Sequence, residues 1–272
     1  MTATAYYNEI DPFAAAWLRN LIDAGCIAPG VVDTRSVEEV TANDLKGFTQ
    51  CHFFAGIGVW SYALRCAGWS DSRPVWTGSC PCQPFSQSGK RRGFNDPRHL
   101  WPTWHQLIKE CAPYVIFGEQ VASKDGLTWF DAVQLDLEEA EYAVAVVDLC
   151  AAGFGAPHIR QRLFWVADAD NEQRPLTLPA RGHEVISRQW NKNSEALAGS
   201  GSDSNASPVN SFWRDADWLF CRDGKWRPVK PGIKPLVNGT PGRVGQLRAY
   251  GNAIVVPVAE AFIRAYMEAV TP

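Results

Sequence analysis

The chain has 272 residues, 46% of them hydrophobic, with a formal net charge of −3 and a pI of about 6.0. This length suits one α/β domain with a small appended region, and the mild acidity excludes a uniformly basic nucleic-acid-binding protein. No run of about 18 apolar residues occurs, so no membrane span is expected. The N-terminus lacks the pattern of a signal peptide. Eight scattered cysteines without metal-site spacing favour a reducing, cytoplasmic location and no metal site.

Short apolar segments alternate with segments of helical periodicity along the first part of the chain. The predicted strands are residues 5–8, 28–32, 48–54 and 74–76, and the predicted helices are residues 12–25 and 59–67. Pro12 follows Asp11, a typical helix cap, and Gly68 ends the second helix. This order predicts a largely parallel sheet with helices on both faces.

The second part of the chain continues the same alternation up to about Asp168. It predicts helices at residues 100–111 and 127–137, strands at residues 113–118, 142–149 and 160–166, and a last helix at residues 258–267. From Asp168 to about Asn210 small and polar residues dominate, which is typical of a flexible segment.

A glycine-rich turn, residues 54–58 (FAGIG), joins a predicted strand to a predicted helix. Glycine there lets the backbone turn sharply and approach a ligand, as in nucleotide-type sites. A turn needed only for packing would look the same in this stretch alone.

Cys82 stands between Pro81 and Pro84, just after a predicted buried strand. Proline lacks an N–H and fixes φ, so the chain must turn there and present the cysteine. A Gly-rich basic segment follows up to Arg98. Taken alone, the pattern fits a buried structural thiol better than a reactive one.

Two further charged patterns follow predicted strands. Glu119 comes at the end of the apolar strand 113–118, where a buried carboxylate is either costly or functional. Arg160 and Arg162 are two residues apart in a predicted strand and are expected on one face of it.

Together these segments resemble the cytosine-C5 DNA methyltransferase family. The resemblance rests on PCQPFS with the following SGK..GF.D.R, FAGIG, Glu119 with Val121, the Arg-x-Arg strand, and residues 250–257 (YGNAIVVP). Gln120 and His158 depart from it, standing where the family has Asn and Gln. It implies a mostly parallel, Rossmann-like methyltransferase sheet, helices on both faces and a small target-recognition region. It also implies the methyl donor S-adenosylmethionine, with S-adenosylhomocysteine as product.

The resemblance assigns roles to individual residues. Cys82 would be the nucleophile toward C6 of cytosine, Glu119 would contact the ring, and Arg160 or, preferably, Arg162 would bind O2. The implied cofactor-binding residues are Glu9, Ile10, Asp33, Thr34, Phe54, Ala55, Gly56, Ile57, Gly58, Pro81, Leu100 and Asn252.

The motifs occur in an unusual order. Glu9-Ile10 and Asp33-Thr34 resemble the family's second and third motifs, yet they precede the glycine turn. A permuted order, with these strand ends beside the glycine turn in the sheet, is therefore predicted. Two alternatives stay open: residues 9–11 serve only as a helix cap, or Asp71 holds the ribose instead of Glu9.

The chain divides into residues 1–168 (catalytic and cofactor-binding), 169–240 (target recognition) and 241–272 (returning to the first domain). Residues 212–234 interleave aromatic and basic side chains, which suits DNA contact or a small Trp-cored hairpin turning at Asp223-Gly224. The predicted DNA-contacting residues are Gln83, Ser86, Ser88, Lys90, Arg91, Arg92, Arg98, Arg222, Lys225 and Arg227. The expected partners are double-stranded DNA and a cognate restriction enzyme, and the protein is expected to be a monomer that does not associate with a membrane. Two alternative functions stay open: a tRNA cytosine-C5 methyltransferase and a catalytically silent DNA-binding relative.

Overall fold

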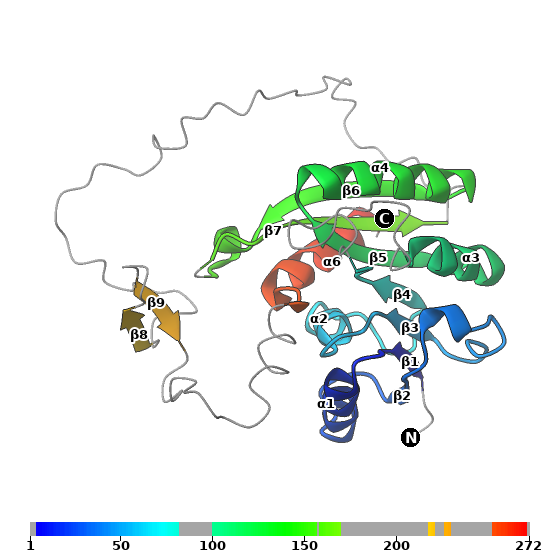
Figure 1. Cartoon of the computed structure of the whole chain (residues 1–272), viewed down its shortest axis with the longest axis horizontal. Helices are drawn as coiled ribbons and strands as arrows, with labels where there is room; N and C mark the ends of the chain where they lie inside the picture. The colour runs from blue at the N-terminus through cyan, green and yellow to red at the C-terminus, as the bar shows by residue number, and fades with distance from the viewer. Residues whose placement is uncertain are drawn as a thin grey trace.

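The computed structural model describes residues 4–81, 100–156, 158–169, 217–220, 226–229 and 252–270. Its main body is a seven-stranded sheet with the order β2-β1-β3-β4-β5-β7-β6 (Figure 1). The strands are β1 (Ala5–Asn8), β2 (Gly30–Asp33), β3 (Gln50–Phe53), β4 (Val75–Gly78), β5 (Val115–Val121), β6 (Ala143–Cys150) and β7 (Gln161–Asp168). Pairing is parallel from β2 to β5, and β7 is antiparallel to β5 and β6. The predicted mostly parallel sheet is confirmed.

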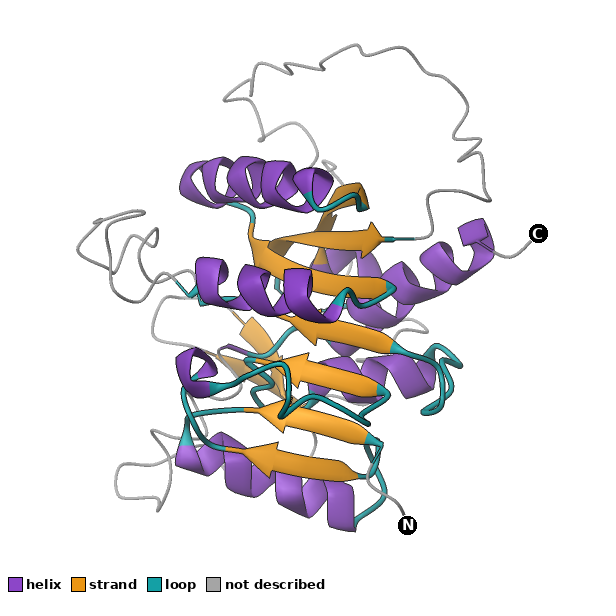
Figure 2. Cartoon of the chain, turned by 90° about the vertical axis from the view of Figure 1, so that its right-hand side faces the viewer, coloured by secondary structure: helices purple, strands orange, loops and turns teal. Residues whose placement is uncertain are grey.

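Helices cover both faces of this sheet (Figure 2). They are α1 (Pro12–Asp23), α2 (Val59–Cys66), α3 (Trp101–Cys111), α4 (Lys124–Glu139) and α6 (Val256–Val270). Helices α3 and α4 bury tryptophans against one face, α2 and α6 cover the other, and α1 adds Leu18 beside β1. The side chain of Asp11 accepts hydrogen bonds from the N–H groups of Phe13 and Ala14, which caps α1 as the sequence predicts.

The carboxyl ends of the first four strands lie in register. Asn8 of β1 pairs with Asp33 of β2 on one side and with Phe53 of β3 on the other. Phe53 in turn pairs with Gly78 of β4. The segments that follow these residues therefore start from a single edge of the sheet, although β1 and β2 precede β3 in the chain. At such an edge α/β folds bind their ligands.

Indole rings pack directly on glycine backbone in the middle of the sheet. Gly78 of β4 pairs with Gly118 of β5. A Cβ atom at Gly78 would lie 2.5 Å from Trp104, and one at Gly118 would overlap Trp165. Glycine is needed at both positions because the two tryptophans fill the space where side chains would stand.

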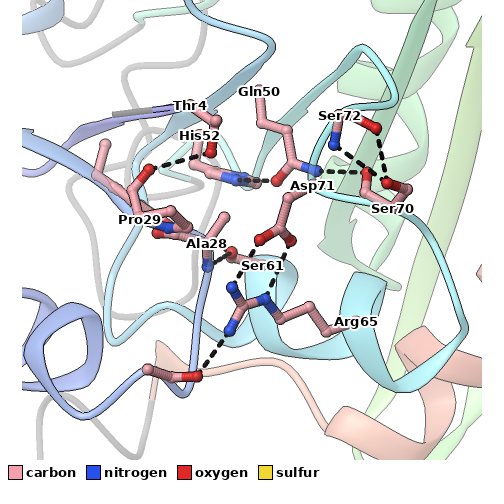
Figure 3. A network of polar contacts seen from close by, with 12 residues as sticks. Thr4, Ala28, Pro29, Gln50, His52, Ser61, Arg65, Ser70, Asp71 and Ser72 are labelled. Atoms are coloured by element: carbon pink, nitrogen blue, oxygen red, sulfur yellow. Dashed lines mark hydrogen bonds and ion pairs between the residues drawn. The ribbon is translucent and has the colours of Figure 1, made fainter. Parts of the chain in front are cut away.

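A polar network joins β3 to the loop that precedes β4, near the amino-terminal ends of these strands (Figure 3). His52 of β3 is bonded through Nδ1 to the Thr77 hydroxyl, at 2.8 Å, and through Nε2 to Gln50 Oε1, at 3.3 Å. The Gln50 amide donates to the carbonyl of Ser70, at 3.2 Å. The Tyr7 ring stacks on the imidazole, with centroids 4.8 Å apart. The buried side chains of Gln50 and His52 thus find hydrogen-bond partners within the sheet and in the loop before β4.

Two short strands form a second, separate sheet late in the chain. Strands β8 (Asp217–Phe220) and β9 (Trp226–Val229) form an antiparallel pair, as the hairpin alternative for residues 212–234 requires; its turn and its Trp core lie outside what the structure describes. Among the residues that the structure describes, no helix is long and apolar enough to cross a membrane. The predicted division into three regions stays a prediction.

Candidate active site

A cavity of about 510 Å³ opens at the carboxyl ends of the parallel strands, a size typical of small-molecule sites. It brings together predicted site residues from across the chain: Glu9, Ile10, Phe54, Ala55, Gly56, Ile57, Pro81, Leu100, Glu119, Arg160, Arg162 and Asn252. They follow β1, β3 and β4, belong to β5 and β7 or directly precede β7, and come from the segments before α3 and α6.

The glycine turn between β3 and α2 forms one wall of the cavity. Phe54, Gly56 and Gly58 all have positive φ angles, of 51°, 56° and 78°. For Phe54 this conformation is strained, a feature that clusters at ligand sites. Gly58 precedes α2 and faces away from the cavity, where a Cβ atom would lie 3.0 Å from Leu18. Gly58 thus makes the turn possible without lining the cavity.

Glu9 links the first strand to the glycine turn. Its Oε2 accepts a hydrogen bond from the N–H of Gly56, at 2.7 Å, and its Oε1 accepts one from the N–H of Asp11, at 2.8 Å. A carboxylate can accept more than two hydrogen bonds, so a ligand hydroxyl is a suitable additional donor to it. Asp71, the alternative acid, is ion-paired with Arg65 at 2.6 Å and is not among the residues that line the cavity.

The second predicted acid lies outside the cavity. Asp33 is the last residue of β2, and its carboxylate accepts hydrogen bonds from Arg35, at 2.6 Å, and from the Tyr6 hydroxyl, at 2.7 Å. Burial opposes ionisation, but these bonds lower the pKa of Asp33 to about 2. Asp33 and Thr34 line a separate, shallow depression instead.

The predicted cofactor contacts of Asp33 and Thr34 stay a prediction, and other residues line that side of the cavity. The chain needs three more residues beyond Asp33 to reach the cavity edge, where Ser36 and Val37 line it. Val37 is buried at the start of the short 3-10 turn η1 (Val37–Glu39). Ser36 and Val37 are therefore additional candidates on that side of the cavity.

Glu119 and Arg162 form a buried ion pair on the opposite wall. Arg162 Nε lies 2.7 Å from Glu119 Oε1, and Glu119 is 7% exposed. Burial raises the pKa of Glu119 above its usual range, against the opposing effect of Arg162, Arg160 and hydrogen bonds from Ser79 and Arg162. The sequence predicts that the strand ends at residue 118, just before Glu119. In the structure β5 extends to Val121, so Glu119 lies inside the strand. A carboxyl that favours its proton can act as a hydrogen-bond donor.

The prediction that Arg160 and Arg162 share one face of a strand is wrong. Strand β7 begins at Gln161, and Arg160 precedes it with a φ of 35°. This conformation turns Arg160 toward the C-terminal segment, where its Nη2 donates to the carbonyl of Ala253, at 2.6 Å. Arg162 contacts Glu119, whereas Arg160 joins the wall of the cavity to residues 252–254.

Gln120 contacts the segment that leads to Cys82. Its amide nitrogen donates to the carbonyl of Cys80, at 3.4 Å, and its Oε1 accepts from the N–H of Val121, at 2.9 Å. Cys80 and Pro81 both line the cavity. The Gln120 side chain therefore reaches the backbone of that segment.

Several predicted residues lie outside the described part of the chain: Cys82, Gln83, Ser86, Ser88, Lys90, Arg91, Arg92, Arg98, Arg222 and Lys225. Arg227 is a residue of β9. Their predicted roles stay predictions. Sequence reasoning did not single out Trp60 and Ser79 as cavity residues. The position of Trp60 in the first turn of α2 could have predicted that it lines the cavity, since ligands bind at the N-termini of helices. Nothing in the sequence pointed to Ser79.

The fold and the cavity define an α/β protein with a ligand site at the carboxyl edge of a parallel sheet. The family model of C-5 cytosine-specific DNA methylases matches residues 72–210, about half of the chain. The chain belongs to this family.

Among curated relatives, the type II methyltransferase M.SsoII of Shigella sonnei is 34% identical over 216 residues, which cover 68% of this chain and 57% of that protein. M1.ScrFI of Lactococcus lactis subsp. cremoris is 35% identical over 170 residues, or 60% of this chain and 42% of that protein. The chain thus spans about half the length of these relatives. A solved structure of a mutant Spodoptera frugiperda DNMT2 matches with a TM-score of 0.43 and 19% identity, over 62% of this chain and 44% of that one.

Proposed function

We propose that this protein transfers a methyl group from S-adenosylmethionine to C5 of cytosine in DNA. The observation that carries the proposal is the buried Glu119–Arg162 pair, which lines the same cavity as the glycine turn and Pro81, the residue before Cys82. Family membership and the names of the type II relatives support DNA as the substrate.

The residues of the cavity fit the methyl donor. Glu9 offers carboxylate lone pairs to ribose hydroxyls, and Phe54 and the 65% exposed Ile10 offer apolar surface to an adenine ring. Gly56, with its backbone N–H held by Glu9, leaves room for a ligand beside the turn. When bound, S-adenosylmethionine supplies an electrophilic methyl group. Asn252 and Leu100 complete the wall around it.

The chain's own residues would activate cytosine. A thiolate of Cys82 forms a bond to C6, and the electron pair of the C5–C6 double bond makes C5 a nucleophile. Protonated Glu119 donates to N3, where negative charge develops, and Arg162 binds O2. After C5 is methylated, its proton leaves to a base or water, and the Cys82–C6 bond breaks to restore the double bond. The basic residues after Cys82 favour the thiolate.

Cytosine inside a duplex cannot reach this cavity, so we infer that the target nucleotide is flipped out of the helix. Extrusion costs a few kcal/mol. The predicted DNA contacts from Gln83 to Arg98 and from Arg222 to Arg227 belong to this part of the proposal. We propose that the protein acts as a monomer, and the type II names of the relatives support a cognate restriction enzyme as partner.

We further propose that the motif order is permuted. The spatial order β2-β1-β3-β4-β5 corresponds to the 3-2-1-4-5 order of doubly wound sheets, with the second and third strands placed first in the chain. The bond between Glu9 and Gly56 supports this assignment, because it joins the upstream acid to the glycine turn.

Methylation with tritiated S-adenosylmethionine tests the main proposal. Unmodified duplex DNA and tRNA are offered separately, and the product is analysed for 5-methylcytosine. We expect label on DNA with the wild type and with Cys26→Ser, a control cysteine that is exposed and outside the cavity lining. Cys82→Ser should lose activity by at least about a thousandfold.

Three outcomes would contradict parts of the proposal. Label on tRNA alone would assign an RNA substrate. DNA binding without label on either substrate would indicate a silent relative. Full methylation by Cys82→Ser would overturn the covalent mechanism.

A further inference from the structure

Asn8, the last residue of β1, carries a side-chain amide that is hydrogen-bonded through its nitrogen only. Asn8 pairs with Asp33 of β2 and with Phe53 of β3, so it lies between two neighbouring strands at the carboxyl edge of the sheet. It is 3% exposed and lines the cavity. Its Nδ2 donates a hydrogen bond to the carbonyl of Arg35, at 2.9 Å. Its Oδ1 has no hydrogen-bond partner among the residues that the structure describes.

The orientation of this amide follows from donor chemistry. A carbonyl oxygen can only accept, so the group of Asn8 that faces Arg35 must be the NH2 group. The Arg35 residue is itself held in place, since its N–H donates to Asp33 Oδ1, at 2.9 Å, and its guanidinium is ion-paired with Asp44, at 3.2 Å. Oδ1 of Asn8 is not among the described unpaired side-chain atoms that are sealed from solvent. It is therefore a fixed acceptor that is open to the cavity.

The place of Asn8 in the cavity indicates which part of a ligand reaches it. Pro81 and Glu119 line the wall at β4 and β5, where the methyl group would be transferred, and Glu9, the proposed partner of the ribose, follows β1. The Asn8 amide faces the segment after β2, on the side away from β4 and β5, because the sheet order is β2-β1-β3-β4-β5. In S-adenosylmethionine the adenine extends from the ribose away from the sulfonium group. The adenine is therefore the part of the ligand that would lie beside Asn8.

We propose that Asn8 Oδ1 accepts a hydrogen bond from the exocyclic amino group of this adenine, so that Asn8 selects the base of the methyl donor. This inference rests on the proposed function. The amino group carries the only N–H donors of the adenine ring, and asparagine amides pair with it in protein–DNA complexes. An acceptor on a buried residue is costly when it stays unpaired, which favours a ligand that donates to it. A purine without the amino group would leave Oδ1 unpaired.

Isothermal titration calorimetry with two ligands tests the proposal. The ligands are S-adenosylhomocysteine and its purine analogue, which has hydrogen in place of the 6-amino group. The wild type should bind S-adenosylhomocysteine at least about tenfold more tightly, because the analogue cannot donate to Oδ1. Asn8→Leu, which has a similar shape and no polar side-chain atoms, should bring the two affinities within about twofold. Asn8→Ala, a second variant that cannot overpack the site, should do the same.

Tyr6→Phe is the matched control. Tyr6 lies two residues earlier in β1, is 3% exposed and donates its hydroxyl to Asp33, at 2.7 Å, but it does not line this cavity. Loss of that bond to the end of β2 should leave the preference for S-adenosylhomocysteine unchanged.

Two results would overturn the proposal. A purely structural role of Asn8, through its bond to Arg35, predicts that Asn8→Leu and Asn8→Ala weaken both ligands by the same factor and keep the wild-type ratio of affinities. That result would leave Asp33 as the candidate for the contact with the amino group. Equal affinities of the wild type for the two ligands would show that the amino group is not recognised at all.

The measurement needs neither DNA nor methyl transfer, so it separates this inference from the proposed function. A preference that depends on Asn8 supports the inference even if the protein methylates tRNA or no nucleic acid. Methylation of DNA by a wild type that binds both ligands equally would contradict the inference and leave the proposed function intact. A wild type that binds neither ligand would contradict both.

Discussion

Glu9 shows how one side chain joins parts of the site that are far apart in the chain. Its bond to Gly56 spans 47 residues of sequence, yet the two positions adjoin because β1 and β3 are neighbours in the sheet. A carboxylate at this place both fixes the glycine turn and faces the cavity. Asp71 has the same chemistry in a different setting, since its ion pair with Arg65 is about one-third exposed.

We predict that Glu9→Gln weakens S-adenosylmethionine binding by at least about tenfold, because the ribose loses a charged acceptor. Asp71→Asn should leave the affinity within about twofold, since an exposed ion pair contributes little. Isothermal titration calorimetry measures both. Loss of binding in Asp71→Asn with normal binding in Glu9→Gln would reject the permuted motif order.

Residue-level prediction from the sequence succeeded where the chain after a strand is short. Glu9 and Phe54 directly follow buried strands, and Pro81 comes three residues after the end of β4, so the positions of the strands determine theirs. It did not foresee that Asp33 lies outside the cavity lining, because neither the Arg35 and Tyr6 bonds nor the extra residues before the cavity edge are visible in a one-dimensional pattern. It also failed for the face of Arg160, since the strand boundary differed by one residue.

At the scale of elements, α3 packs on the sheet through the Trp104 ring, which contacts other aromatic rings and the backbone of a glycine. The Trp104 ring faces Phe53 of β3, at 5.7 Å, and contacts Trp165 of β7, at 6.2 Å. Gly78 and Gly118 leave the space that these rings occupy. The positions of the strands and helices followed from the periodicity of the sequence. The contacts of Trp104 and Trp165 with the two glycines did not, because periodicity predicts which face of an element is buried but not which residues pack against it.

We predict that Gly118→Ala lowers the free energy of unfolding by about 1–3 kcal/mol, since the Trp165 ring must shift to admit a methyl group. Gly153→Ala is the control, because a Cβ atom there meets no atom within 4 Å. Urea denaturation followed by tryptophan fluorescence compares the two. Equal stability of both variants would mean that the ring moves at no cost.

At the scale of the whole molecule, the buried network around His52 joins the strands that the permuted order brings together. Tyr7 of β1 stacks on His52 of β3, and Thr77 of β4 completes the imidazole's bonds. The Tyr7 hydroxyl reaches Ser61 of α2, at 2.9 Å. The network thus connects the N-terminal strands with the glycine-turn unit, on which the cofactor side of the cavity depends.

This network requires a neutral imidazole. Gln50 Oε1 can only accept, so His52 donates from Nε2, and Nδ1 accepts from the Thr77 hydroxyl. Burial lowers the pKa of His52 to about 3, with a small opposing effect from the Asp71 charge. In the unfolded chain the pKa is about 6.5. The folded protein therefore binds fewer protons than the unfolded chain between these values, and its stability falls as pH drops below about 6.5.

We predict that the free energy of unfolding contributed by His52 falls by about 2 kcal/mol between pH 7.5 and pH 5. Other groups also contribute to the pH dependence of stability, and Glu119, whose pKa is raised by burial, acts with the opposite sign. The comparison is therefore the difference in slope between the wild type and His52→Gln, measured by urea denaturation at several pH values. His52→Gln should lose less stability than the wild type on acidification, whatever its stability at pH 7.5. His158→Gln, at an exposed position, should follow the wild type. Parallel curves for the wild type and His52→Gln would show that the buried imidazole does not govern acid stability.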